Sequence, residues 1–190
     1  EVSDHGLALF LALARRIVAA DQAVKGGGWD VVAHKGIQRL RGQTLGLLGF
    51  GKIARALAAK AQALGMRVIA TDPFVDAETM ARLQVRAVDM DTLLAESDAV
   101  SVHVPLSHET RGIIGERALA RMKPTAFLIN TSRGGLVDEA ALAAALTAGR
   151  LAGAALDVVE KEPPPPDHPL RRAPNIILTP HLAFYSREAV

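Results

Sequence analysis

Residues Thr44–Pro73 read TLGLLGFGKIARALAAKAQALGMRVIATDP, and the order of features in this stretch decides the fold. An apolar run leads into Gly49 and Gly51, a segment with alanine and leucine at helical spacing follows, and a second apolar run closes on Asp72. Gly49 allows the chain to turn tightly off a strand, and Gly51 lets backbone N–H groups at the start of a helix approach a pyrophosphate. Strand, glycines, helix, strand and acid in that order predict a dinucleotide-binding βαβ unit.

The acid at the end of the second run indicates which dinucleotide binds. Asp72 lies 21 residues beyond Gly51, where a carboxylate accepts hydrogen bonds from the adenosine ribose hydroxyls. The same carboxylate would repel a 2′-phosphate, and no arginine follows it in TDPFVDAE. NAD is therefore expected, with NADP as the alternative. Taken alone, the Gly-x-Gly-x-x-Ala motif would also fit a glycine-rich turn that binds nothing.

Length and composition limit the classes of protein to which the chain can belong. Its 190 residues are 49% hydrophobic, which suits one well-buried core, and no apolar run approaches the roughly 20 residues that span a membrane. There is no cysteine and no secretory leader pattern, so we expect a cytoplasmic protein without a disulfide or Cys-metal framework. A net charge of +2 and 4% aromatic residues argue against nucleic acid as a partner.

The pattern of the first βαβ unit continues to the end of the chain. Short apolar runs without alternation, typical of strands covered on both faces, alternate with helical patterns. This predicts an α/β fold with a doubly wound parallel sheet, the Rossmann fold. The expected strands are Thr44–Gly49, Arg67–Thr71, Ala99–His103, Ala126–Asn130, Gly153–Leu156 and Asn175–Leu178, with a weaker one at Gln84–Val88, and the expected helices are Lys52–Leu64, Ala77–Leu83, Met90–Glu96, Gly115–Met122 and Asp138–Ala148.

The residues before Thr44 predict one long helix and a connecting segment. Residues 1–24 carry apolar side chains at helical spacing, and Ser3 or Asp4 can cap this helix. Three successive glycines then break the periodicity, so residues 25–43 are expected to connect the helix to the first strand. Elsewhere, the residues placed to begin or end helices are Asp89 and Asp138 as N-caps and Gly65 and Gly149 as left-handed C′ residues.

Polar side chains follow three of the expected strands, at the edge where open parallel sheets bind ligands. Arg133 follows the run FLIN, Asp157 and Glu162 follow GAAL, and His181 follows IIL. Taken singly, they fit a solvated loop residue, an exposed acidic turn and a satisfied histidine. Together they supply what hydride transfer to a 2-keto acid requires. An arginine pairs with the substrate carboxylate and polarises the carbonyl, a histidine protonates the alkoxide, and a nearby carboxylate raises the pKa of that histidine by stabilising imidazolium.

These motifs resemble the NAD-binding domain of the D-isomer-specific 2-hydroxyacid dehydrogenases. The resemblance covers nearly the whole chain and is most specific in GQTLGLLGFGKIARALA, FLINTSRGGLVDEAAL and NIILTPHLAFYS. It implies an NAD-dependent D-2-hydroxyacid dehydrogenase whose catalytic residues are Arg133, Glu162 and His181, with Glu160 as the wrong choice of glutamate. It also implies that Asp157 faces the nicotinamide carboxamide. The implied cofactor-binding residues are Gly49, Gly51, Lys52, Ile53, Asp72, Val104, Pro105, Thr110, Thr131, Ser132, Asp157 and Ala183.

The remaining histidines and the chain ending are interpreted from the same resemblance. His103 is expected to be structural, and His108 and His168 to be solvated loop residues. The ending HLAFYS is more similar to the branch of C-terminal-binding-protein-like dehydrogenases, where the aromatic residue, here Phe184, approaches the substrate and makes an apolar substrate side chain plausible. That branch leaves a second function open, an NAD(H)-responsive, corepressor-like interaction protein. The intact Arg133, Glu162 and His181 set favours the enzyme, because a sensor needs no proton donor.

The resemblance also implies a domain organisation. Residues 1–190 are expected to form the NAD-binding domain of a two-domain dehydrogenase whose substrate domain is largely absent from this sequence. Residues 1–24 would be the interdomain helix that packs across a homodimer interface, and residues 182–190 would begin the return to the second domain.

Overall fold

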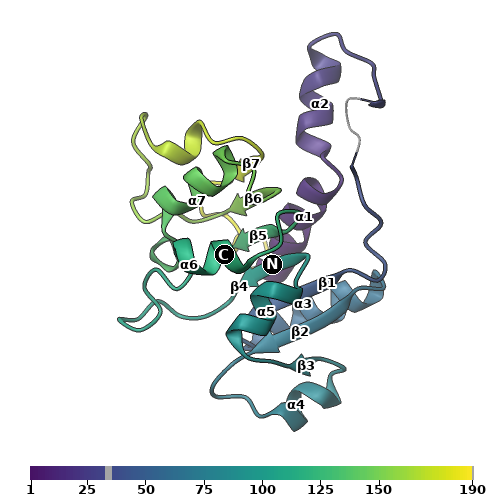
Figure 1. Ribbon diagram of the computed structural model, residues 1–190, viewed down its shortest axis with the longest axis vertical. Helices are drawn as coiled ribbons and strands as arrows, with labels where there is room; N and C mark the ends of the chain where they lie inside the picture. Colours follow the sequence, from purple (N-terminus) through teal and green to yellow (C-terminus); the bar gives the residue numbers. More distant parts are fainter. Residues whose placement is uncertain (33–35, 190) are drawn as a thin grey trace.

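The computed structural model describes residues 1–32 and 36–189. Residues 33–35, which belong to the expected connecting segment, and 190, the last of the expected return segment, lie outside the described residues. The described strands form a seven-stranded parallel sheet in the order β3-β2-β1-β4-β5-β6-β7 (Figure 1). The strands are β1 (Thr44–Leu48), β2 (Arg67–Thr71), β3 (Arg86–Ala87), β4 (Ala99–Val102), β5 (Phe127–Asn130), β6 (Gly153–Leu156) and β7 (Ile176–Leu178).

Helices cover both faces of this sheet, which confirms the predicted doubly wound fold. The α-helices are α1 (Val2–Ala14), α2 (Ile17–Lys25), α3 (Lys52–Ala63), α4 (Ala77–Arg82), α5 (Met90–Glu96), α6 (Glu116–Arg121) and α7 (Glu139–Thr147). Short 3-10 helices span Gly134–Leu136 and Pro169–Arg171. The chain leaves β1 toward β2 on one side and returns to β4 on the other, so the strand order reverses beside β1. Open parallel sheets bind nucleotides at this kind of switch point.

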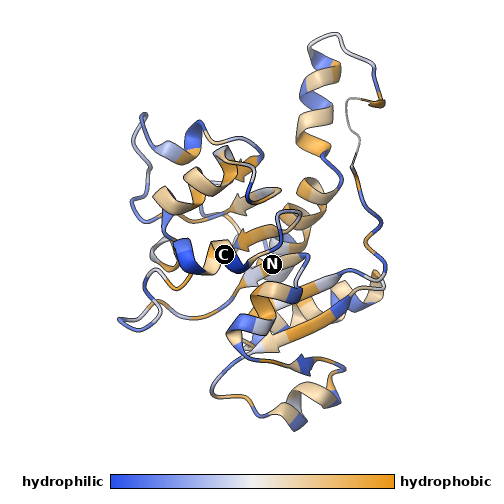
Figure 2. Ribbon diagram, in the orientation of Figure 1, coloured by the Kyte–Doolittle hydropathy of each residue, from blue (hydrophilic) through white to orange (hydrophobic). Residues whose placement is uncertain are grey.

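Alternation along the strands divides the core into two layers. Val68 and Ala70 of β2 pack into the cluster that includes α1 and α3, whereas Ile69 between them packs into the cluster that includes α5, α6 and α7. Successive strand residues point to opposite faces, and both faces here are covered. The hydrophobic residues accordingly gather on the central strands (Figure 2). This double burial explains why the strands read as continuous apolar runs.

The predicted single helix over residues 1–24 is wrong, because the helix is interrupted. α1 ends at Ala14, and Arg16 takes a left-handed backbone conformation with φ 52° before α2 begins. α1 packs its buried face onto α3, β5 and β6, but α2 has no buried residue and projects from the body of the domain (Figure 1). The break lets the chain leave the sheet, and no glycine or proline in the sequence marks it.

The predicted cap of the first helix is also wrong, since Ser3 and Asp4 lie inside α1 and Glu1 is the N-cap without a side-chain bond. Both side chains instead accept hydrogen bonds from Lys60 of α3. The other helix ends follow the prediction. Asp89 and Asp138 accept N–H bonds from Thr92 and Ala141, and Gly65 and Gly149 have φ of 78° and 65°.

The weak strand expected at Gln84–Val88 contains only the two residues of β3. Gln84 has a φ of 57° and forms part of the turn that follows α4, so it cannot extend the strand. The other expected strands and the helices after Thr44 are present with ends shifted by no more than two residues.

Gly46, in the middle of β1, provides a test of the packing between the sheet and α5. A Cβ atom there would lie 2.1 Å from Ser97 Oγ and 3.0 Å from Leu93 Cγ. We expect Gly46→Ala to destabilise the fold by about 1–3 kcal/mol, because Ser97 Oγ is held by its bond to the Leu93 carbonyl. Urea denaturation measures this.

Gly6→Ala is the matched control. A Cβ at Gly6, inside α1, would make an ordinary contact of 3.9 Å with Thr131 Oγ1. We expect no loss of stability and a gain of up to about 1 kcal/mol from helix propensity. Equal stabilities for the two variants would contradict this packing.

Candidate functional site

The residues predicted to form the site follow strands that end together at one edge of the sheet. Leu48 of β1 pairs with Val102 of β4, which pairs with Asn130 of β5. Asn130 pairs with Leu156 of β6, which pairs with Leu178 of β7. Because the strands are parallel, the segments that follow them leave from the same edge. These segments carry the predicted glycines, Thr131 to Arg133, Asp157 to Glu162, and His181.

The turn after β1 has the geometry of a phosphate-binding loop. Gly49 has φ 91°, and a Cβ there would lie 2.8 Å from the carbonyl carbon of His103. Gly51 is the N-cap of α3, and a Cβ there would meet open space. The fold itself thus requires a glycine at position 49 but not at position 51, where the free space lies at the start of α3 and suits an incoming pyrophosphate. Lys52 and Ile53 are exposed in the first turn of α3.

Asp72 is tied to this turn by its own carboxylate. Oδ2 accepts the N–H of Phe50, between the two glycines, at 2.7 Å, and Oδ1 accepts the N–H of Phe74 at 2.8 Å. The side chain is therefore fixed beside the turn while each oxygen keeps capacity for a further donor, such as a ribose hydroxyl.

The loop after β4 is held by bonds within itself. Thr110 Oγ1 donates to the Pro105 carbonyl at 2.6 Å and accepts the Ser107 N–H at 2.8 Å. Val104 is half-buried, with its Cγ1 3.0 Å from the position of a Cβ on Gly49. These bonds order the loop that carries the predicted Pro105 and Thr110, and Val104 at its start lies next to the glycine turn.

Two hydroxyls after β5 differ in their use. Ser132 Oγ donates to the Val102 carbonyl at 2.8 Å, so it joins β5 to β4. Thr131 is buried, and its Oγ1 has no hydrogen-bond partner among residues 1–32 and 36–189. A buried hydroxyl without a partner is costly, and a ligand that bonds it would remove this cost. The residues around the glycine turn therefore fit a dinucleotide.

The structure brings His181 and Glu162 together. His181 Nδ1 lies 2.7 Å from Glu162 Oε2, and Glu162 Oε1 accepts the Val159 N–H at 3.1 Å. Glu160 points elsewhere and pairs with Arg111 at 2.6 Å. A carboxylate on Nδ1 makes that nitrogen the N–H donor, which leaves Nε2 of the half-exposed imidazole to exchange a proton with a ligand.

His181 is held in an unusual backbone conformation by Asp157. Its φ of 54° lies in the left-handed region, which costs a non-glycine residue roughly 1–2 kcal/mol. The His181 N–H donates to the Asp157 carbonyl at 2.8 Å, and the carboxylate of Asp157 accepts the N–H groups of Leu182 at 3.1 Å and Ala183 at 2.8 Å. Asp157 is buried, with 1% exposure, and orders the turn after β7. Its expected contact with the nicotinamide carboxamide stays a prediction.

Arg133 is exposed and has no carboxylate partner within the described residues. Its Nη1 donates to the Ser132 carbonyl at 2.7 Å, and its own carbonyl accepts a bond from Asn130 Nδ2 at 2.8 Å. A Cβ on the next residue, Gly134, would lie 1.9 Å from the carbonyl carbon of Val159. The arginine loop therefore packs directly against the loop that leads to Glu162.

The remaining histidines differ from one another. His108 is exposed as expected, but the prediction that His168 is solvated is wrong, because its ring is buried and lies 2.9 Å from Glu139 Oε2. Glu139 lies 29 residues earlier in the chain, and no sequence pattern links the two. His103 Nε2 bonds Ser101 Oγ at 2.9 Å, and burial lowers the pKa of His103 to about 4, so the ring is neutral.

Sequence reasoning missed His5 and Thr179. Thr179 Oγ1 lies 2.5 Å from Asp157 Oδ1, and His5 Nε2 lies 3.0 Å from Thr179 Oγ1. His5 belongs to α1, 174 positions before Thr179, so only the fold brings them together.

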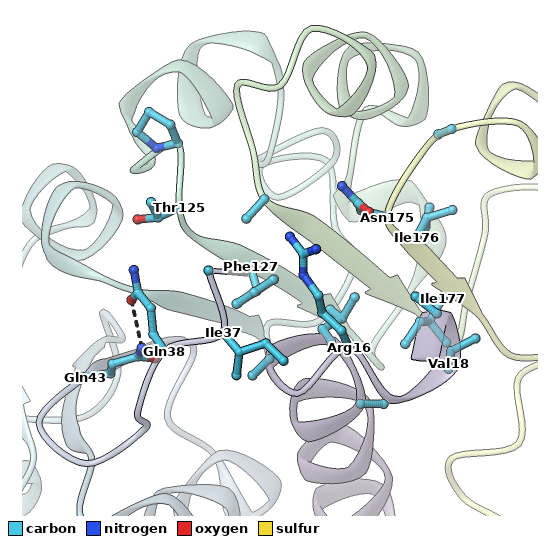
Figure 3. A pocket seen from close by; sticks show the side chains of 18 of the residues that line it. Arg16, Val18, Ile37, Gln38, Gln43, Thr125, Phe127, Asn175, Ile176 and Ile177 are labelled. Atoms are coloured by element: carbon cyan, nitrogen blue, oxygen red, sulfur yellow. Dashed lines mark hydrogen bonds between the residues drawn. The ribbon is translucent and has the colours of Figure 1, made fainter. Parts of the chain in front are cut away.

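A hollow of about 500 Å³ opens at the opposite edge of the sheet, where Phe127 begins β5 and Ile176 begins β7 (Figure 3). It contains none of the predicted site residues. Within the described part of the chain, no three side chains of His, Cys, Asp or Glu gather as metal ligands do. Among the same residues, none of the helices is both long and apolar enough to cross a membrane.

Comparison with known proteins identifies the family. Residues 7–183 match the family described as D-isomer specific 2-hydroxyacid dehydrogenase, NAD binding domain. The chain belongs to this family. The NAD-binding domain of a D-isomer-specific 2-hydroxyacid dehydrogenase is thus the unit that the sheet, the glycine turn and Asp72 build, and NAD is its cofactor.

The chain is similar over nearly its whole length to relatives that are longer. It is 49% identical to D-3-phosphoglycerate dehydrogenase of Archaeoglobus fulgidus, covering 98% of this chain and 35% of that protein. It is 47% identical to glyoxylate reductase of Korarchaeum cryptofilum, covering 98% of this chain and 57% of that protein. The crystal structure of D-lactate dehydrogenase with NAD+ from Lactobacillus jensenii superposes with a TM-score of 0.89 at 32% identity, covering 99% of this chain and 60% of that one.

Because His103 is kept neutral in this domain, it makes stability depend on pH. Its folded pKa of about 4 lies below the ordinary 6.5, so the unfolded chain binds more protons between these values and stability falls as the pH falls through them. We expect this group to cost about 2 kcal/mol of stability between pH 7.5 and pH 5. Denaturation at both pH values measures the free energy of unfolding that is lost between them. This loss should be about 2 kcal/mol smaller in His103→Gln than in the wild type. The matched control, His108→Gln, should lose as much stability as the wild type; equal losses in all three proteins would contradict the assignment.

Proposed function

We propose that this chain is the cofactor domain of an NAD-dependent oxidoreductase that transfers a hydride between nicotinamide and a 2-keto or D-2-hydroxy acid. The observation that carries the proposal is the bond of 2.7 Å between His181 Nδ1 and Glu162 Oε2 at the ligand-binding edge of the sheet. A histidine oriented by a carboxylate is the arrangement of a general acid or base. Membership of the family supports the same reaction class.

The proposed steps assign one task to each side chain. Bound NADH supplies the hydride in the reducing direction. Arg133 pairs with the substrate carboxylate and polarises the carbonyl, for which its exposed guanidinium, without a carboxylate partner among residues 1–32 and 36–189, is suited. His181 Nε2 gives its proton to the carbonyl oxygen as the hydroxyl forms, and Glu162 stabilises the imidazolium before the transfer. In the oxidising direction His181 takes the hydroxyl proton.

The cofactor contacts belong to the same proposal. The free space before α3 receives the pyrophosphate, with Lys52 and Ile53 contributing N–H groups. Asp72 accepts bonds from the ribose hydroxyls, which excludes a 2′-phosphate. Val104, Pro105 and Thr110 line the cofactor from the loop after β4, and the hydroxyl of Thr131, with Ser132, Asp157 and Ala183, lies toward the nicotinamide.

Turnover of the protein that contains this chain, followed by NADH absorbance, tests the proposal. We expect His181→Ala to lower kcat by about 100-fold or more with the affinity for NADH retained, and Arg133→Lys to raise KM for the keto acid. A Glu160→Gln variant is the matched control for Glu162→Gln, and only the latter should lower kcat.

A panel of 2-keto acids tests the substrate preference. We expect the enzyme to favour acids with an apolar side chain, because the ring centroid of Phe184 lies 6.1 Å from that of His181. Full turnover by His181→Ala, or no turnover by the wild type with any 2-keto acid, would overturn the proposal.

We also propose that catalysis requires a second domain, with residues 1–190 as the cofactor domain and 182–190 leading to that domain. The chain spans 35% and 57% of the two relatives' lengths, so they contain further sequence. A closed cleft excludes water and orients the substrate. Steady turnover by the 190 residues alone, at the rate of the longer protein, would contradict this.

A cytoplasmic location remains a prediction that rests on the cysteine-free composition.

We also propose a homodimer through residues 1–24, in which the projecting α2 provides the exposed part of the interface. None of the residues of α2 is buried, and Ile17, Val18 and Val24 are 55%, 41% and 47% exposed. Arg16 extends over the neighbouring hollow, whose apolar lining includes Phe127 (Figure 3). A short helix without buried residues is marginal in water, so a second copy that covers it would stabilise it.

Light scattering after size exclusion tests the dimer. We expect the mass of two chains for the wild type and of one chain for Val24→Asp, because a carboxylate in an apolar interface is costly. Ala63→Asp, an exposed position at the end of α3 and outside residues 1–24, is the control and should leave the dimer intact. A monomeric wild type would refute this interface.

A further inference from the structure

We propose that His5 is a positioning residue for His181, acting through Thr179 and Asp157. This rests on the proposed function of His181. His5 is in the first turns of α1 and touches neither Glu162 nor the glycine turn, and the sequence motifs of the site do not include it. It reaches the turn after β7 from the opposite end of the chain.

The contacts form a continuous chain of polar atoms. His5 Nε2 lies 3.0 Å from Thr179 Oγ1 and 3.5 Å from Asp157 Oδ1. Thr179 Oγ1 lies 2.5 Å from the same Asp157 oxygen. The side chain of Asp157 is fully buried and that of His5 is 19% exposed, so solvent cannot easily replace these bonds.

The chemistry of the groups fixes the direction of the bonds. A buried carboxylate only accepts, so the single hydroxyl proton of Thr179 is directed to Asp157. Thr179 Oγ1 then accepts from His5, which must carry its proton on Nε2. His5 therefore adds a bond that holds the hydroxyl in this rotamer, and the hydroxyl supplies Asp157 with a third donor beside the N–H groups of Leu182 and Ala183.

This arrangement matters because Asp157 holds the backbone around His181. The left-handed conformation at His181 persists only while the surrounding bonds favour it. The His181 N–H is shared between the carbonyls of Asp157 and Thr179, and the next two N–H groups donate to the Asp157 carboxylate. If Thr179 loses its partner, the Asp157 carboxylate can turn and the N–H groups after His181 lose their common acceptor. Nε2 would then be less well placed while the nucleotide end of the site, built on the turn after β1, stays intact.

Variants of His5 that keep or remove the donor test the proposal in the protein that contains this chain. We expect His5→Leu to lower kcat by about tenfold or more, since small misplacement of a reacting group is costly, with the Kd for NADH changed less than twofold. His5→Gln places an N–H donor near the same point and should restore most of kcat. His108→Leu, an exposed histidine, is the matched control and should behave as the wild type. Equal kcat for His5→Leu and the wild type, or equal losses for His5→Leu and His5→Gln, would overturn the proposal.

A second pair of variants, at Thr179, tests the same path without changing His5, in case the His5 variants do not fold. Thr179→Ser keeps the hydroxyl and should be active, whereas Thr179→Val keeps the shape and should lose as much kcat as His5→Leu. The double variant His5→Leu, Thr179→Val should be no worse than either single variant, because both remove the same path. Additive losses would show that the two residues act separately and would contradict the path.

Nitrogen NMR of the imidazoles separates this proposal from the proposed function. The 15N shifts of His5 should report the tautomer protonated at Nε2, and Thr179→Val should shift the His181 nitrogens but not those of His108. These signals do not depend on turnover. If these signals are found and the wild type turns over no 2-keto acid, the enzymatic role alone is refuted. An Nδ1-protonated His5, or His181 signals that Thr179→Val does not move, would refute the positioning role.

Discussion

The parallel direction of the seven strands that the structure describes is the constraint on which the site depends. Each strand must be followed by a crossover, so the segments that leave β1, β4, β5, β6 and β7 start from one edge of the sheet. Segments as distant in the sequence as those of Gly49 and His181 thereby start from the same edge without any local sequence signal. The two apolar layers fix this edge, because a slip of one residue in register would turn each strand's core residues to the other face.

The functional side chains are placed by backbone contacts around them. Gly134 lets the arginine loop lie against Val159, and Asp157 holds the turn that carries His181. A buried carboxylate is costly unless several donors satisfy it, so the conformation that provides those donors is favoured over alternatives. Glu162 then needs only to bond Nδ1 for the imidazole to present its other nitrogen. The proposed proton transfer follows from this order of constraints.

Much of this could be predicted from sequence, and the failures share a physical cause. The strands, the glycine turn and Asp72 are signalled by local patterns, and the resemblance to the family selected Glu162, which bonds His181, over Glu160. No glycine or proline in the sequence signals the interruption at Arg16, and the burial of His168 depends on a partner 29 residues away, Glu139. The link from His5 to Thr179 likewise joins residues far apart, for which the sequence carries no spacing rule. Caps at Ser3 and Asp4 failed because Lys60 of α3 bonds both side chains.

Arg133 and His181 are proposed to act together on one substrate beside the nicotinamide ring. A crystal structure of the longer protein with NAD+ and a non-reacting 2-keto acid analogue measures this directly. We expect Arg133 to pair with the analogue's carboxylate, His181 Nε2 to lie within hydrogen-bond distance of its carbonyl oxygen, and Glu162 to remain on Nδ1. An analogue bound by other residues, with Arg133 and His181 facing different sides of the domain, would contradict it.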